Sequence, residues 1–389
     1  MTLSEATWYS RRVVGWGRGM GDEKGYWLAL SRVGGIGAVR FRTLLAAFGS
    51  IEAAWHATPE SLRESGIGPA AVAALVDGRR RIEPEQESAR VVEAGFEALT
   101  WLDEGYPERL REIAQPPPVL YASGTIEARD RWAVAVVGTR KPTAYGISAA
   151  RDLGRVLGAN GVLVVSGMAR GIDAVAHLAA LEAGGRTVAV LGSGLDQVYP
   201  PEHRSLASRI RSNGAVVSDY PLGTKPDAAN FPPRNRIISG LAAAVVVIEA
   251  GDGSGALITA DFGAEQGREV FAVPGSIYSR SSRGCHRLIE NGARPLIAFE
   301  DVLEALNLEA AVMADHQPER LPEDETERSI IRCLSAEPVH VDELHALSGL
   351  PVATLTATLA MLELKGFARQ VGGMHYVRLH EVGSPYRVD

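Results

Sequence analysis

Five turn-like segments recur through the middle of the chain, at residues 137–142, 166–173, 191–196, 230–236 and 251–256; all but 230–236 contain glycine, and several carry arginine. A helix that starts just after such a turn presents free backbone N–H groups, and these groups and arginine side chains are donors that bind phosphate. One segment alone is explained equally well by a tight turn with a solvated arginine. Five such segments in one chain instead predict an anion site. The residues expected to contact the anion are Gly138, Thr139, Arg140, Lys141, Ser166, Gly167, Arg170, Gly171, Arg234, Asn235, Arg236, Gly253, Ser254 and Gly255.

Several common anion sites are excluded by their motifs. The runs 192–197 and 253–258 lack the third glycine of the dinucleotide fingerprint, and the chain has no Gly-Lys-Ser/Thr of a Walker A loop and no G-x-S-x-G. A row of arginine and amide donors suits successive phosphates, and a flexible single strand fits a groove along a sheet edge better than a rigid duplex. We therefore expect single-stranded nucleic acid. Phe231 is a candidate for stacking on a base, and a place in the core explains this residue as well.

No metal, cofactor or nucleophilic site is expected. The two cysteines, Cys285 and Cys333, and nine scattered histidines form neither C-x-x-C nor H-E-x-x-H. Cys285 and His286 are adjacent, but nothing in the sequence supplies a third group to complete a catalytic set. The residues themselves therefore predict an anion groove and no catalytic set.

The charge of the chain is segregated. The formal net charge is −7, yet residues 131–300 carry 18 basic and 14 acidic side chains, whereas the rest carries 22 and 33. A polyanion site therefore belongs in the middle of the chain.

Short apolar runs alternate with helical patterns over the same region. We predict strands at 132–137, 162–166, 187–191, 215–218, 243–249, 270–273 and 296–298. Helical patterns lie between most of them, at 147–157, 174–183, 202–211 and 256–266. This alternation is typical of α/β proteins with a parallel sheet covered on both faces, here a doubly wound, Rossmann-like domain. Ligands bind at the carboxyl ends of such strands, where the glycine-rich segments fall.

The Rossmann-like domain (99–307) is expected to follow a leader (1–24) and a small helical domain (25–98) of SAM- or helix-hairpin-helix-like type. Two Gly-Ile-Gly turns, at 35–37 and 66–68, punctuate the helical domain. In helix-hairpin-helix units, the backbone N–H groups of such a turn bind a nucleic-acid phosphate. A plain helical bundle with two tight turns and no ligand fits the same pattern.

An acidic linker (308–325) is expected to lead to a winged-helix domain (326–380) and a tail (381–389). Three helical patterns precede two short strands joined at Gly372-Gly373, which is the winged-helix plan. The third helix, 351–365, carries one lysine and one glutamate, so it lacks the charge that binds a DNA backbone. The composition favours a protein contact over reading of duplex DNA.

Nothing in the sequence suggests a membrane. The longest apolar stretch, 241–248, is far shorter than a spanning helix, and the N-terminus lacks the charged and apolar regions of a signal peptide. We expect a cytoplasmic protein.

Eight ordered motifs carry a family resemblance: 137–140 (VGTR), 166–173 (SGMARGID), 194–196 (GLD), 199–200 (YP), 231–241 (FPPRNRIISGL), 254–257 (SGAL), 273–275 (VPG) and 288–293 (LIENGA). Together they closely resemble the DprA (Smf) family, bacterial proteins that process DNA in natural transformation. The resemblance is dense over about residues 100–305 and implies a protein without catalysis. Such a protein binds and protects incoming single-stranded DNA, forms a homodimer through its Rossmann-like domain, and loads the recombinase RecA.

The resemblance also implies roles for individual residues. Gly138, Thr139 and Arg140 correspond to the phosphate-gripping motif, and the arginines at 170, 234 and 236 complete the groove. Where many relatives have a basic residue after Tyr-Pro, this chain has Pro201, which puts the DNA path beyond Tyr199 in doubt. The helix expected at 284–291 resembles the family's dimer region, although an ordinary covering helix explains it too. The candidate dimer contacts are His286, Ile289 and Leu296.

Two other functions compete with this interpretation. Phosphoribohydrolases that act on nucleotides also use a Rossmann-like fold, but the run 251–259 lacks the glutamate of their Pro-Gly-Gly-x-Gly-Thr-x-x-Glu signature. A transcriptional regulator would read duplex DNA with a basic recognition helix, which the third helix of the winged domain does not supply.

Overall fold

The computed structural model describes residues 20–306, 324–335, 338–365 and 367–378. Its contacts divide the chain into two compact units, Met1–Glu309 and Ala310–Asp389, and each is described by itself.

Three of the predicted segments fall largely outside the described residues. They are the leader up to residue 19, the linker over 308–323, and the tail at 381–389. Helix α2 begins at Met20, so the last residues assigned to the leader are helical.

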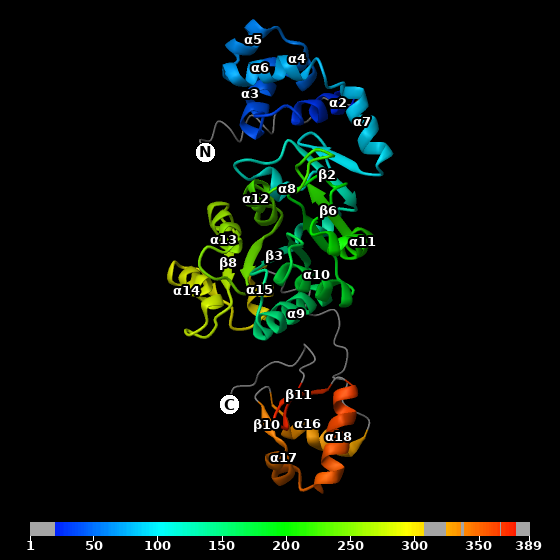
Figure 1. The fold of residues 1–389 in the computed structure, drawn as a ribbon, viewed down its shortest axis with the longest axis vertical. Helices are drawn as coiled ribbons and strands as arrows, with labels where there is room; N and C mark the ends of the chain where they lie inside the picture. Colours follow the sequence, from blue (N-terminus) through cyan, green and yellow to red (C-terminus); the bar gives the residue numbers. More distant parts are fainter. Residues whose placement is uncertain (1–19, 307–323, 336–337, 366, 379–389) are drawn as a thin grey trace. The chain divides into compact units, whose positions relative to one another are not determined.

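Among the described residues of the first unit, nine strands form one sheet (Figure 1). In order across the sheet they are β1 (Glu97–Thr100), β2 (Val119–Gly124), β6 (Gly214–Ser218), β5 (Thr187–Val190), β4 (Leu163–Ser166), β3 (Ala133–Val137), β7 (Ala244–Val247), β8 (Glu269–Ala272) and β9 (Arg294–Pro295). Neighbours pair in parallel, except that β2 pairs antiparallel with both β1 and β6. Strands β3 to β7 are buried along their whole length, which requires a layer of helices on each face. The predicted α/β fold class is confirmed.

The helices divide between the two faces of the sheet. From β3 the chain runs outward through α9 (Ala144–Ala159), α10 (Ile172–Glu182) and α11 (Arg204–Ser212) to β6. It then returns through α12 (Phe231–Leu241) to β7 and continues through α13 (Gly255–Glu265) to β8. Because parallel crossovers are right-handed, the two directions of travel place the two sets on opposite faces. α9 packs on α10, and α12 packs on α13 (Figure 1). The carboxyl ends of β3 and β7 therefore flank the point where the strand order reverses, which is the usual ligand position of such sheets.

Some elements differ from the prediction. β1 and β2 were not predicted, and three prolines at 116–118 interrupt the apolar pattern just before β2. β9 lies two residues before the strand predicted at 296–298, although the Leu296 N–H still donates to the Ala272 carbonyl. α12 begins within the predicted loop 230–236, since prolines in its first turn favour the start of a helix.

The N-terminal helices are α2 (Met20–Ser31), α3 (Ala38–Phe48), α4 (Ile51–His56), α5 (Pro59–Glu64), α6 (Pro69–Gly78) and α7 (Pro84–Glu93). The two Gly-Ile-Gly turns precede α3 and α6. Arg40 joins them, because its guanidinium donates to the carbonyl oxygens of both Gly35 and Ile67. The remaining helices of this unit are α8 (Glu108–Arg111), α14 (Arg283–Glu290) and α15 (Glu300–Ala305).

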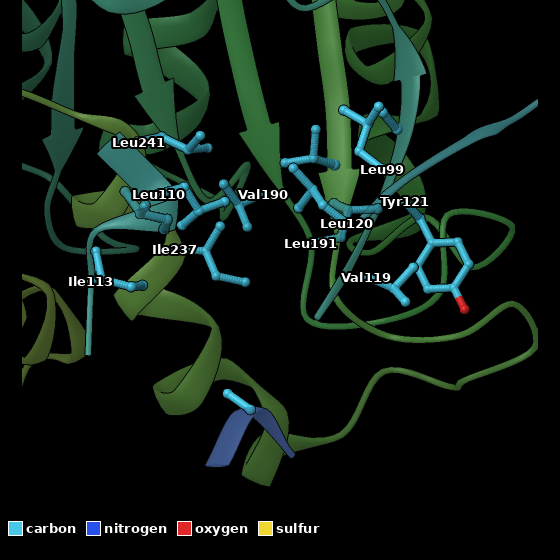
Figure 2. Close-up of a cluster of buried hydrophobic side chains, with 14 of the residues drawn as sticks. Leu99, Leu110, Ile113, Val119, Leu120, Tyr121, Val190, Leu191, Ile237 and Leu241 are labelled. Carbon is cyan, nitrogen blue, oxygen red and sulfur yellow. The ribbon is translucent and has the colours of Figure 1, made fainter. Parts of the chain in front are cut away.

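One hydrophobic core runs from these helices into the sheet. Trp27 of α2 contacts Phe41 of α3 and Trp101, which follows β1. Figure 2 shows the part of the core where strands meet α8 and α12, and its labelled residues are Leu99, Leu110, Ile113, Val119, Leu120, Tyr121, Val190, Leu191, Ile237 and Leu241. The edge strand β1 and its neighbour β2 therefore tie the helical domain to the sheet.

The second unit has the winged-helix plan. Its elements are α16 (Glu325–Cys333), β10 (Val339–His340), α17 (Val341–Ser348), α18 (Val352–Leu364), β11 (Ala368–Gly372) and β12 (His375–Arg378). The strands pair in the order β10-β12-β11, and β10 was not predicted. Ile330, Leu344, Leu355 and Leu359 form the centre of a separate core.

Within the described residues, no single helix is both long and apolar enough to span a membrane. α17 and α18 meet that test only as a pair, and they are bent by 110° at their junction.

Candidate nucleic-acid interface

The loop from β3 to α9 presents two exposed cationic side chains of the predicted set. Arg140 and Lys141 are exposed, and Arg140 has no hydrogen-bond or salt-bridge partner within the described residues. Gly171 lets the next loop come close, because its φ is +82° and a side chain there would collide with the Thr139 carbonyl. The two loops that follow β3 and β4 therefore lie against each other at the carboxyl edge of the sheet.

Phe231 lies at the centre of this edge. Its ring centroid is 5.5 Å from Cζ of Arg140 and 5.8 Å from Cζ of Arg234, and the ring of Tyr199 is 5.8 Å away at 36°. A Cβ on Gly192 would come within 2.8 Å of the Phe231 ring, so the ring can pack against the backbone at Gly192 only because that residue has no side chain. The ring is half-buried, which leaves both base stacking and packing as roles for it.

Arg234 lies beneath the surface. It is only 5% exposed, and its Nη2 donates to the Gly167 carbonyl over 3.3 Å. A side chain on Gly167 would collide with this guanidinium. Burial lowers the pKa of Arg234 to about 10, and the nearby Asp173 opposes that shift. Arg234 therefore supplies positive charge and supports the Phe231 ring from below, without itself reaching solvent.

The amides of the loop after β4 are bonded within the protein. Asp173 Oδ2 accepts from the N–H groups of Gly167 and Ala169, over 3.1 and 3.3 Å. Burial raises the pKa of Asp173, while the charge of Arg234 and these amides act against the rise. Ser166 is buried and donates to the Val136 carbonyl over 2.6 Å. These groups shape the loop, and the N–H groups of Gly167 and Ala169 are already bonded within the protein.

Arg170 is exposed but paired. Its Nε lies 2.5 Å from Oε1 of Glu202, which follows Pro201 in a short 3-10 turn. This hydrogen bond raises the pKa of Arg170 and lowers the pKa of Glu202. Pro201 stands where many relatives have a basic residue, and the next residue, Glu202, neutralises the charge of Arg170 on this wall of the predicted groove.

The other predicted residues of α12 and α13 make internal bonds. Asn235 is buried, and its Nδ2 donates to the Gly255 carbonyl over 3.1 Å. Arg236 pairs with Asp219 at 2.9 Å and also donates to the carbonyls of Gln115 and Pro233. Ser254 caps α13 by accepting from the Ala256 N–H, and Gly253 has a φ of +75°. Arg140, Lys141 and Arg170 are therefore the cations of the predicted set that reach solvent most directly.

One acidic residue at this edge was not singled out from the sequence. Glu249 follows β7 and is 2% exposed, and its carboxylate accepts from Thr143 and Ser281. A glutamate directly after the apolar run 241–248 is the only sequence signal for it.

The candidate dimer residues differ in exposure. Leu296 is 5% exposed and packs in its own core, so it offers little surface to a second chain. Ile289 is half-buried against the core, and His286 Nε2 lies 2.9 Å from the Gly275 carbonyl oxygen. Exposed apolar side chains near them in the sequence are Ile277 (75% exposed), Tyr278 (90%) and Ile297 (77%).

The described residues contain no group of three metal-binding side chains. Cys285 is fully buried, and burial raises the pKa of its thiol to about 11, so little thiolate forms at neutral pH.

Comparison with known families matches three successive parts of the chain. Residues 97–307 match DNA recombination-mediator protein A, residues 314–374 the DprA winged helix domain, and residues 21–84 a DprA-like N-terminal helix-hairpin-helix domain. Protein Smf of Synechocystis is 36% identical over 92% of this chain and 99% of its own length. DNA processing protein DprA of Bacillus subtilis is 41% identical over 55% of this chain and 72% of its own length.

Two solved structures are similar as well. DNA processing protein A from Streptococcus pneumoniae aligns with a TM-score of 0.64 and 34% identity, over 72% of this chain and 97% of that one. The protein from Helicobacter pylori aligns with a TM-score of 0.50 and 28% identity, over 55% of this chain and 96% of that one. That structure is described for its single-stranded DNA binding mode.

Proposed function

Because the chain belongs to the DprA family of DNA recombination-mediator proteins, we propose that it binds single-stranded DNA at the carboxyl edge of its sheet. The observation that carries this proposal is the placement of exposed Arg140 beside the half-buried ring of Phe231, with exposed Lys141 next in the chain. Guanidinium and ammonium groups bind phosphates, and an aromatic ring next to them accepts a base of any sequence.

Arg234 acts in this site through its charge and its contacts. It lies under Phe231 and adds to the positive potential without a contact to phosphate. Arg170 reaches the DNA backbone when the strand displaces Glu202 from it.

The proposed role of the complex is to protect the strand and to load RecA on it. The family description as a recombination mediator supports this step. The test incubates an oligonucleotide of about 30 nucleotides with the protein, adds a single-strand nuclease, and in parallel follows DNA-dependent ATP hydrolysis by RecA. Slower digestion and faster onset of RecA activity are expected. Unchanged digestion and a delayed onset would contradict the proposal.

We further propose that two chains associate through the Rossmann-like domain. The exposed apolar side chains Ile277, Tyr278 and Ile297, together with half-buried Ile289, support a contact in this region. A dimer carries two DNA-binding grooves. Once a long strand is bound in one groove, the effective concentration of the strand at the second groove is high, so the overall affinity rises although neither groove binds more tightly by itself.

The winged-helix unit is proposed to contact protein. α18 exposes Val352, Met361 and, at 82%, Leu364, whereas a helix that reads a DNA groove carries basic and polar side chains. Specific binding of a duplex by the full chain, lost on Leu364→Arg but kept on Arg140→Ala, would contradict this assignment.

We expect the protein to act in the cytoplasm and without catalysis of its own. The buried Cys285 thiol supports the second expectation, since it is a poor nucleophile. Incubation with nucleoside monophosphates followed by product analysis tests it, and turnover would favour the phosphoribohydrolase interpretation.

A further inference from the structure

Glu249 contacts both ends of the loop that carries Arg140 and Lys141. Its backbone carbonyl accepts from the Thr139 N–H over 2.7 Å. Its carboxylate accepts from the Thr143 N–H over 2.9 Å and from the Thr143 hydroxyl over 2.7 Å. The two exposed cations lie between these two anchors in the sequence.

The carboxylate also occupies the start of α9. Thr143 is the N-cap of that helix, and its N–H is among the groups that face phosphate at other helix N-termini. Gly146, in the first turn of α9, leaves the room that Glu249 needs, because a Cβ there would collide with the carboxylate. The helix N-terminus at the reversal point of the sheet is therefore filled by a side chain of the protein itself.

A third contact reaches the opposite side of the edge. The Ser281 hydroxyl donates to Glu249 Oε1 over 3.1 Å, and Ser281 lies in the 3-10 turn Arg280–Ser282 that follows exposed Tyr278. With the side chain 2% exposed, Glu249 does not contact DNA. Any effect of this residue on binding must pass through the segments that it holds.

We propose that Glu249 is a positioning residue that fixes the loop 138–143 so that Arg140 and Lys141 meet a phosphate chain. This inference rests on the proposed binding of single-stranded DNA. The same contact explains why exposed arginines bind the phosphates at this edge. The Thr143 N–H at the start of α9 is not free to bind a phosphate, because it already donates to the Glu249 carboxylate.

The test compares the intact chain with Glu249→Ala, Glu249→Gln, Arg140→Ala and the double variant Glu249→Ala/Arg140→Ala. Binding of an oligothymidine of about 30 nucleotides is measured by fluorescence anisotropy at several salt concentrations, with circular dichroism to establish folding. Glu249→Ala removes three acceptor contacts and should weaken binding about fivefold to tenfold. Glu249→Gln keeps an acceptor for the Thr143 N–H and a donor for its hydroxyl, so it should recover most of the affinity.

The double variant separates positioning from general destabilisation. If Glu249 acts through the loop, Glu249→Ala should cost little once Arg140 is gone, and the two losses should not add. Gly146→Ala, which pushes on the carboxylate from the helix side, should weaken binding in the same way. Asp324→Ala is the matched control, because Asp324 also caps a helix with its carboxylate but belongs to the second unit.

The outcomes are distinct. An intact chain that does not bind the oligonucleotide overturns the proposed function itself. Binding by the intact chain with no loss in Glu249→Ala, or with an equal further loss in the Arg140→Ala background, overturns the positioning role. If Glu249→Ala does not fold, the comparison of Glu249→Gln with Gly146→Ala decides: full affinity in Gly146→Ala contradicts the proposal.

Discussion

Replacement of Arg140 by alanine removes one cation from the exposed edge and leaves the core untouched. Arg140 is exposed, and within the described residues it has no hydrogen-bond or ion-pair partner, so its loss should not destabilise the fold. One lost phosphate contact lowers the slope of log affinity against log salt by about 0.7 for a single strand. Between about 50 and about 200 mM salt, the affinity ratio of intact chain to variant should therefore shrink by about 2.6-fold.

The assay is anisotropy of a labelled oligonucleotide, measured at four salt concentrations and with two unrelated sequences. Both sequences should lose the same factor, because Arg140 meets phosphate and not base edges. Arg155→Ala is the matched control, since Arg155 is exposed near the other end of α9. A change in base preference with an unchanged salt slope, or an equal effect of Arg155→Ala, would refute the assignment of Arg140 to the phosphate chain.

Three further predictions follow from individual contacts. Glu202→Gln frees Arg170, so anisotropy should report tighter single-stranded DNA binding and a salt slope steeper by about 0.7; weaker binding would show that the pair supports the site. In sedimentation, Ile297→Glu should give folded monomers if two chains meet at this surface, whereas Leu296→Glu should unfold the chain because it buries a carboxylate. Burial lowers the pKa of His177 to about 3, so below about pH 6.5 this histidine is protonated in the unfolded chain but stays neutral in the folded chain. The free energy of unfolding should therefore fall as the pH drops from about 6.5 towards 3, by up to about 1.4 kcal/mol per pH unit, and urea titrations of His177→Asn should lack this component. An equal pH dependence in the variant would contradict it.

The sheet could be predicted because its central strands are continuous apolar runs bounded by glycine. β3, β4 and β5 each fall within one residue or so of the expected segments, since burial on both faces leaves little ambiguity in the pattern. β1 and β2 were not predicted because they lie at one side of the sheet, outside the alternating pattern of strands and helices, and flank a proline-rich segment. Their position became evident only from the core that they share with α2 and α8.

The meeting of the glycine-rich segments at one edge of the sheet could be predicted, but their contacts could not. The glycine-rich segments do meet at the carboxyl edge, yet the sequence gives no means to distinguish exposed Arg140 from buried Arg234 or from Arg236, which pairs with Asp219. Exposure and pairing depend on residues far away in the chain. For the same reason the contacts of Glu249 could not be predicted, because its partner Thr143 lies more than a hundred residues earlier.

Preference for single strands is the property that most directly tests the account. One oligonucleotide of about 30 nucleotides is measured alone and annealed to its complement, each over a range of salt concentrations. We expect tighter binding of the single strand, with an affinity that falls as salt rises and that depends on Arg140. Equal or tighter binding of the duplex, or an affinity for the single strand that does not change with salt, would contradict it.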